Sequence, residues 1–167
     1  MWMLTPKNYQ KIRDAFPAGS RRLALLRFCY SCLPLPVWFV YPVLLLLLWR
    51  QQDARLLRVV LVPAAAFGLC TVLRRLLHQP RPYDQPGFVP LVEKDTVGLS
   101  CPSRHAASVT VITLACCYLN SNLGGFLAVL TVLICAVRIL AGVHHPRDVF
   151  AGVALSLLVG GVGFWLL

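Results

Sequence analysis

The chain has 167 residues, of which 58% are hydrophobic and only 13% are charged, and its mean hydropathy is +0.71. This composition excludes an ordinary soluble domain, and several apolar runs of helical length predict an all-α, polytopic transmembrane helix bundle. The formal net charge of +10 comes mostly from arginine, and no nucleic-acid-binding motif accompanies the dispersed basic residues. We therefore expect membrane lipids and an anionic substrate as partners, and no nucleic acid.

Residues 1–22 form a basic segment in which five lysines or arginines accompany one carboxylate, Asp14. This pattern predicts an interfacial or cytoplasmic segment, followed by a single transmembrane domain over residues 23–167. The first strongly apolar stretch begins near Leu23 and has no small-residue cleavage site before the next apolar run. We therefore expect no cleavable signal peptide.

The first apolar region, residues 23–49, is long for one membrane helix and short for two. Prolines interrupt it at Pro34, Pro36 and Pro42, which permits either one kinked helix or two short helices. We favour two short helices that meet at residues 33–36. This path would return the chain to the side of the basic N-terminal segment before Arg50, Arg55 and Arg58.

Four further spans follow, so the sequence predicts about six membrane helices in all. They cover roughly residues 59–77, 102–119, 123–141 and 146–167, with a polar loop over residues 83–100 and a tight turn over residues 120–122. Alternating crossings place three polar clusters on one membrane face, namely residues 74–81, 103–105 and 138–148. If Arg50, Arg55 and Arg58 on the opposite face mark the cytoplasm, these clusters face outward from the cell membrane.

The most unusual stretch runs from Arg138 to Asp148, because it places two arginines, two histidines and a carboxylate between apolar runs. Pro146 suits the first position of a helix, so Asp148 occupies the third and can reach back toward His144. A carboxylate on one ring nitrogen fixes the histidine tautomer and leaves the other nitrogen free to attack. A helix-capping Asp148 beside an exposed His144 is the alternative interpretation.

The three clusters together predict a phosphate site. Helices that begin at Pro102 and Pro146 would direct free N–H groups to the shared face. We expect His144 to act as a nucleophile and His105 to protonate a leaving oxygen. The arginines expected around the same anion are Arg74, Arg81, Arg104 and Arg138.

These residues resemble the three-part signature of the type 2 phosphatidic acid phosphatase superfamily. Its first motif is matched by Arg74, six residues and Arg81-Pro82; its second by residues 102–105, read P-S-R-H; its third by Arg138, five residues, His144, three residues and Asp148. The match covers roughly the C-terminal 95 residues, within a catalytic core that we place at about residues 59–167. This chain has Arg74 where the family has lysine, Arg104 where it has glycine, and Val137 where it has serine.

The resemblance implies a metal-independent membrane phosphatase without cofactors. His144 would form a phosphohistidine, His105 would protonate the leaving group, Asp148 would orient His144, and Ser103 would join the arginines in binding the phosphate. It implies a bell-shaped pH profile and a lipid phosphate or diphosphate as substrate. We favour undecaprenyl diphosphate, with phosphatidylglycerol phosphate or phosphatidic acid as alternatives.

Other interpretations remain open at this point. A non-catalytic lipid-phosphate binder or transporter would use the arginines but would give His144 and Asp148 no task. A haloperoxidase is a relative in chemistry, but such relatives are soluble. Metal binding by His144, His145 and Asp148 is disfavoured by the nearby arginines, and we expect a capping or interface role for His145. Seven cysteines scattered through apolar segments argue against a disulfide framework, and no redox-domain pattern surrounds Cys29 and Cys32.

Overall fold

The computed structural model describes residues 3–167, and every regular element within them is helical. The helical bundle predicted from composition is therefore confirmed. The elements in chain order are α1 (Pro6–Asp14), α2 (Arg21–Cys32), α3 (Pro34–Arg50), α4 (Arg55–Leu77), η1 (Pro82–Asp84), α5 (Arg104–Leu119), α6 (Ser121–Leu140), α7 (Pro146–Gly161) and η2 (Val162–Leu166).

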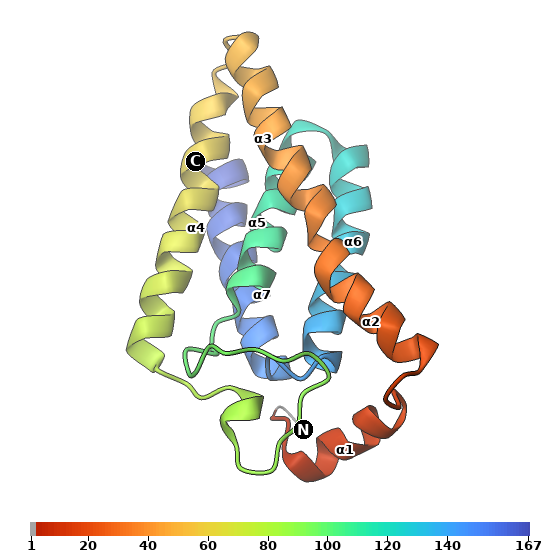
Figure 1. The fold of residues 1–167 in the computed structure, drawn as a ribbon. Coiled ribbons are helices and arrows are strands. Elements are labelled where there is room, and N and C mark those ends of the chain that lie inside the picture. Colours follow the sequence, from red (N-terminus) through yellow and green to blue (C-terminus); the bar gives the residue numbers. More distant parts are fainter. Residues whose placement is uncertain (1–2) are drawn as a thin grey trace.

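Helices α2 and α3 follow one another in the same direction, as Figure 1 shows in red and orange. The residue between them, Leu33, has helical backbone angles of φ −58° and ψ −34°. Pro34 begins α3, where its missing N–H and fixed φ are tolerated. The two helices predicted in this region are present, but the expected return of the chain is wrong. They form one kinked candidate span, Arg21–Arg50.

Helix α5 lies at the centre of the bundle and packs against α3, α4, α6 and α7. Small residues such as Ala106, Ala107 and Ala115 are fully or almost fully buried on it, and they let neighbouring helices approach closely. Three more candidate spans surround it: Arg55–Asp84, Ser121–Leu140 and Pro146–Leu166. The predicted turn between α5 and α6 is confirmed, because the Asn120 side chain caps α6 by accepting the N–H of Leu123.

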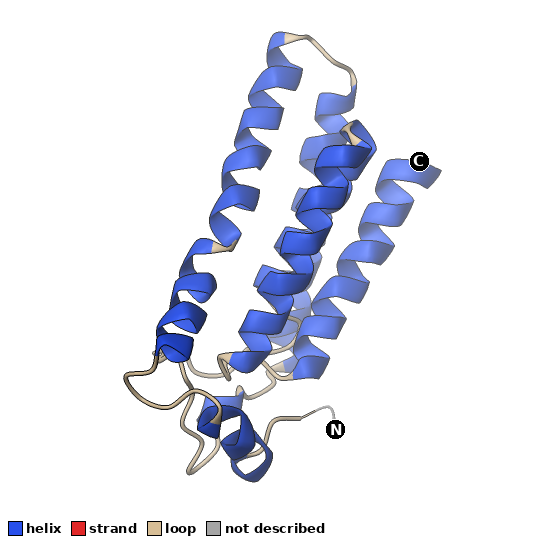
Figure 2. Cartoon of the chain, turned by 90° about the vertical axis from the view of Figure 1, so that its right-hand side faces the viewer, coloured by secondary structure: helices blue, strands red, loops and turns tan. Residues whose placement is uncertain are grey.

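Large apolar side chains cover the outside of the bundle. Phe39 is 74% exposed, Leu76 75% and Leu158 70%, on three different helices. Such a surface is unfavourable in water and suits the hydrocarbon core of a bilayer. Together with the long apolar spans, it identifies the chain as a multi-pass membrane protein. Figure 2 shows the long helices of the bundle running side by side.

One end of the bundle carries all three polar clusters. The end of α4, the start of α5, the end of α6 and the start of α7 meet there, as predicted (Figure 1). The turn between α3 and α4, which carries Arg50, Arg55 and Arg58, lies at the opposite end. Because α2 and α3 cross only once, however, α1 lies at the polar end too. The prediction that the basic N-terminal segment shares a side with Arg50 is therefore wrong.

Candidate active site

A cavity of about 150 Å³ opens at the polar end, and side chains from four helices and two loops line it. Six of the eight predicted site residues are among them, so the structure brings together segments far apart in the sequence. The lining residues are Tyr30, Arg74, Arg81, Lys94, Thr96, Arg104, His105, Arg138, Val143 and His144.

His144 lies in the loop between α6 and α7 and is only 4% exposed. Burial holds the pKa of His144 well below its ordinary value, because a charged ring is poorly solvated there, and Arg81 and Arg74 lower the pKa further. The ring is therefore neutral at pH 7, as a nucleophile requires. The interpretation of His144 as an exposed residue beside a capping aspartate is wrong.

Asp148 is fully buried at the third position of α7, as the sequence predicts. Its carboxylate does not hydrogen-bond His144 directly, because Asp148 Oδ2 lies 4.0 Å from His144 Nδ1. The Ser100 hydroxyl stands between them, 2.5 Å from Oδ2 and 3.3 Å from Nδ1. The expected direct contact is thus replaced by a contact through Ser100.

Three of the four arginines that line the cavity, Arg74, Arg81 and Arg138, each use part of the guanidinium group in a contact within the protein. Arg74 Nη1 donates to the Pro102 carbonyl at 2.9 Å, and Arg81 Nε donates to the Gly98 carbonyl at 2.9 Å. The Arg138 guanidinium lies 4.1 Å from the centre of the Tyr30 ring. A guanidinium has five N–H donors, so each arginine keeps donors for an anion.

Helix α5 begins at Arg104 and not at Pro102, because Ser103 is its N-cap. The Ser103 hydroxyl accepts the N–H of Ala106, and the residue is fully buried outside the cavity lining. The structure therefore does not bring the Ser103 side chain to the predicted phosphate site. The first N–H groups of α5, at Arg104 and His105, have no partner within the helix and lie where these residues line the cavity.

His105 stacks against an aromatic side chain that faces lipid. The rings of His105 and Trp38 lie 6.3 Å apart at an interplanar angle of 16°. Trp38 comes from α3 and is 56% exposed. The His105 ring therefore lies between the cavity and the exposed surface of α3.

The N-terminal segment is attached to the loop that carries His144. The backbone N–H of Leu4 donates to Nδ1 of His145 at 2.9 Å, and the Tyr9 hydroxyl donates to the Leu140 carbonyl at 2.8 Å. Gly142, with φ +74°, leaves room for the Tyr9 ring, since a Cβ there would lie 2.7 Å from it. His145 is the N-cap of α7, as predicted.

Sequence reasoning missed Ser100, Tyr30, Lys94 and Thr96. Tyr30 belongs to an apolar helix, and the other three belong to the long polar loop. No spacing relates them to the three motifs. For Ser100, Lys94 and Thr96 the only signal was their position in a polar loop, because such loops often shape the sites beside them. Tyr30 had no such signal.

Gly152 lets α7 approach the start of α5. A Cβ at this position would lie 2.6 Å from the Ser103 carbonyl oxygen. We expect Gly152→Ala to lower the free energy of unfolding by about 1–3 kcal/mol, because the rigid backbone must move. Thermal unfolding in detergent measures the change. Gly161→Ala on the same helix is the control, since a Cβ there meets nothing within 4 Å. Equal melting temperatures for both variants would contradict the close approach.

Comparisons with known proteins agree with this architecture. A family model described as the PAP2 superfamily matches residues 55–167. Decaprenylphosphoryl-5-phosphoribose phosphatase of Mycobacterium tuberculosis is 39% identical over 99 residues, which cover 58% of this chain and 52% of the relative. The chain thus spans about half the length of the curated relatives it matches.

Two solved structures share the fold. Aquifex aeolicus LpxE superposes with a TM-score of 0.71 at 22% identity, covering 95% of this chain and 93% of that one. The transmembrane PAP2 type phosphatidylglycerolphosphate phosphatase from Bacillus subtilis superposes with a TM-score of 0.65 at 21% identity, covering 94% and 83%. Since the family model matches more than half of the sequence and the fold agrees, the chain belongs to the PAP2 superfamily.

Proposed function

We propose that this chain is an integral membrane phosphatase that hydrolyses a lipid phosphate or diphosphate monoester through a phosphohistidine intermediate. One observation carries the proposal: four arginines and two histidines from separate parts of the chain line one cavity of about 150 Å³. The nearest buried carboxylate, Asp148, is occupied by Ser100 and by the His145 N–H. The positive charge in the cavity therefore remains available to an anion.

In the first step, His144 Nε2 bonds to phosphorus while the bond to the lipid oxygen breaks. His105 gives its proton to the departing oxygen, and Arg74, Arg81 and Arg138 stabilise the charge on the phosphoryl oxygens. A water molecule then attacks the phosphohistidine and gives a proton to His105. Inorganic phosphate leaves and His144 returns to its neutral form. The proposal assigns no step to a metal or cofactor.

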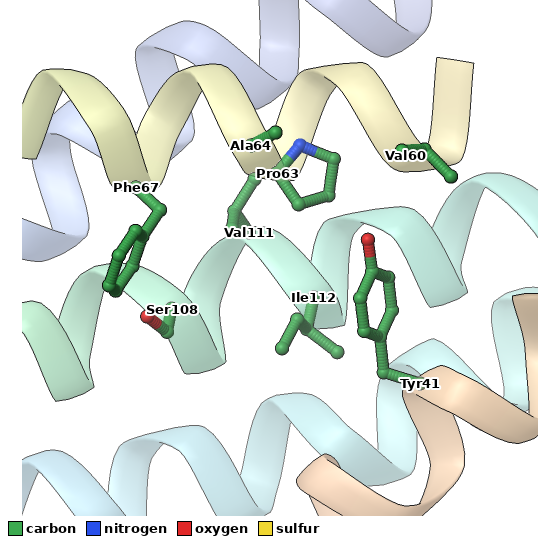
Figure 3. Close-up of a pocket in the computed structure, with 8 residues that line it drawn as sticks. All are labelled: Tyr41, Val60, Pro63, Ala64, Phe67, Ser108, Val111 and Ile112. Carbon is green, nitrogen blue, oxygen red and sulfur yellow. The ribbon is translucent and has the colours of Figure 1, made fainter. Parts of the chain in front are cut away.

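An apolar groove supports a lipid as the source of the phosphate. It measures about 340 Å³ between α3, α4 and α5, and its lining includes Tyr41, Phe67 and Ser108 (Figure 3). Ser108 lies one helical turn beyond Arg104 on α5, and Tyr41 lies one turn beyond Trp38 on α3. The groove therefore lies about one helical turn from the contact between Trp38 and His105, on the side away from the cavity. We propose that it holds the hydrocarbon chain of the substrate.

Among lipid phosphates we propose undecaprenyl diphosphate. The mycobacterial relative is named as a phosphatase of a decaprenylphosphoryl compound, which supports a polyprenyl chain. The Bacillus structure is named as a phosphatidylglycerolphosphate phosphatase, so that lipid and phosphatidic acid remain the alternatives to test.

Phosphate release by the purified protein from these three lipids tests the proposal. We expect release from at least one of them, in the presence of EDTA, with inhibition by vanadate, an analogue of phosphate. The lipid with the highest kcat/KM identifies the preferred substrate. Binding of the lipids without any phosphate release would favour a binder or transporter, and loss of activity in EDTA would overturn the metal-independent mechanism.

The outward orientation in the cell membrane stays a prediction. All lysines and arginines except Arg50, Arg55 and Arg58 lie on elements at the cavity end of the bundle. On the positive-inside rule, this distribution favours the cytoplasm for that end. In the outward orientation, the basic residues of the cavity and of the N-terminal segment would lie outside the cell, contrary to the positive-inside rule.

A reporter fused after Leu167, at the opposite end of the bundle, decides the orientation. A cavity that faces outward makes a green fluorescent protein fusion bright and an alkaline phosphatase fusion inactive. The reverse pattern would overturn the predicted orientation and place substrate binding on the cytoplasmic leaflet.

A further inference from the structure

We infer that Ser100 is a positioning residue, which links Asp148 to His144 and fixes the proton of the His144 ring on Nδ1. The inference rests on the proposed function, because it explains how His144 is prepared for attack. Ser100 lies in the loop before α5, outside the three motifs that identify the family.

The distances set the direction of each hydrogen bond. Ser100 Oγ lies 2.5 Å from Asp148 Oδ2, a short contact typical of a hydroxyl that donates to a carboxylate. A serine hydroxyl has only one proton, so toward His144 the same oxygen is an acceptor. At 3.3 Å it accepts from Nδ1. Nδ1 must therefore carry the ring proton, and Nε2 keeps its lone pair.

Asp148 does not perform this task alone. Its Oδ2 lies 4.0 Å from His144 Nδ1, beyond hydrogen-bonding distance, and also accepts the backbone N–H of His145 at 3.0 Å. Its Oδ1 faces Arg147 at 3.5 Å. Within residues 3–167, the Ser100 hydroxyl is the hydrogen-bond partner of the His144 ring. Without it, nothing holds the proton on Nδ1, and a ring protonated on Nε2 has no lone pair with which to attack phosphorus.

Ser100 itself is held from both sides. It is fully buried, its backbone N–H donates to the Gln79 carbonyl at 2.9 Å, and its own carbonyl faces Arg74 Nη1 at 3.5 Å. The hydroxyl therefore has a fixed place from which to orient the ring. The same contacts join the segment that carries Arg74 and Arg81 to the histidine, so the first and third motifs meet at a residue that belongs to neither.

Steady-state kinetics on the lipid that the protein hydrolyses best test the inference. We expect Ser100→Ala to lower kcat about 10- to 100-fold, the usual effect of removing a group that orients an active residue. KM should stay within about threefold, because the arginines that bind phosphate are untouched. Ser100→Thr keeps the hydroxyl and should recover most of kcat. Ser156→Ala is the matched control, since Ser156 is also fully buried and its hydroxyl donates to the Ala107 carbonyl, away from the cavity.

Two further measurements separate positioning from a structural effect. Vanadate should raise the melting temperature of Ser100→Ala as much as that of the wild type if the cavity is intact. Nuclear magnetic resonance of isotope-labelled histidine should show the His144 proton on Nδ1 in the wild type and on Nε2 in Ser100→Ala. Wild-type kcat in Ser100→Ala, or a wild-type ring protonated on Nε2, would overturn the inference. Absence of phosphate release from the wild type would instead overturn the proposed function, and the ring proton would still test the role of Ser100.

Discussion

We expect the His144→Asn variant to release phosphate at least about 10⁴-fold more slowly than the wild type, because an asparagine side chain cannot form the proposed covalent intermediate. Asparagine keeps a polar side chain of similar size beside Ser100. The affinity for vanadate should therefore fall much less than kcat. Phosphate release measured with excess enzyme separates the chemical step from product release.

His78→Asn is the control for this prediction. His78 ends α4 at the same end of the bundle, is exposed, and has φ +45°, a backbone conformation that asparagine tolerates. It should keep wild-type activity. If His144→Asn also kept wild-type activity, the nucleophile would have to be a different group, and the proposed phosphohistidine at His144 would be wrong.

The three motifs were predictable because each is a local pattern with a fixed internal spacing. Arg81, His105 and His144 lie in different parts of the sequence, but the order of membrane crossings already placed them on one face. The structure adds that they line the same cavity. Spacing also placed Asp148 at the third position of α7. Spacing does not predict which side chains are in direct contact. In the structure, the contact between Asp148 and His144 passes through Ser100.

The path of the first apolar region was not predictable for a different reason. Pro34 and Pro36 are compatible both with a break between two helices and with the first turn of a helix that continues in line. Only the packing of the first apolar region against the other helices decides between these two paths. In the structure, Val37 of α3 is fully buried against α5 and α6, which keeps the chain on one course. That course carries the basic N-terminal segment to the cavity end, where Leu4 and Tyr9 contact His145 and Leu140 on either side of the loop that carries His144.

Arg138→Ala should lower kcat/KM about 10²- to 10³-fold, the effect of removing one strong donor from the site where charge develops. The residue is 5% exposed, and its guanidinium lies over Tyr30, which fixes the direction of its remaining donors. The chain has Val137 where the family has serine, and Val137 packs among apolar side chains. In the proposed mechanism, Arg138 therefore binds the phosphate without help from a hydroxyl at position 137.

Arg138→Lys separates the charge of Arg138 from its geometry. Lysine keeps the positive charge but has neither the planar fork nor the stacking surface, so we expect an activity between those of the wild type and Arg138→Ala. Arg75→Ala is the matched control, because Arg75 is an exposed arginine at the same end of the bundle and does not line the cavity. Its activity should match that of the wild type. If Arg75→Ala and Arg138→Ala lost activity equally, the arginines would act through the net charge of the surface, and the cavity would not be where phosphate is bound.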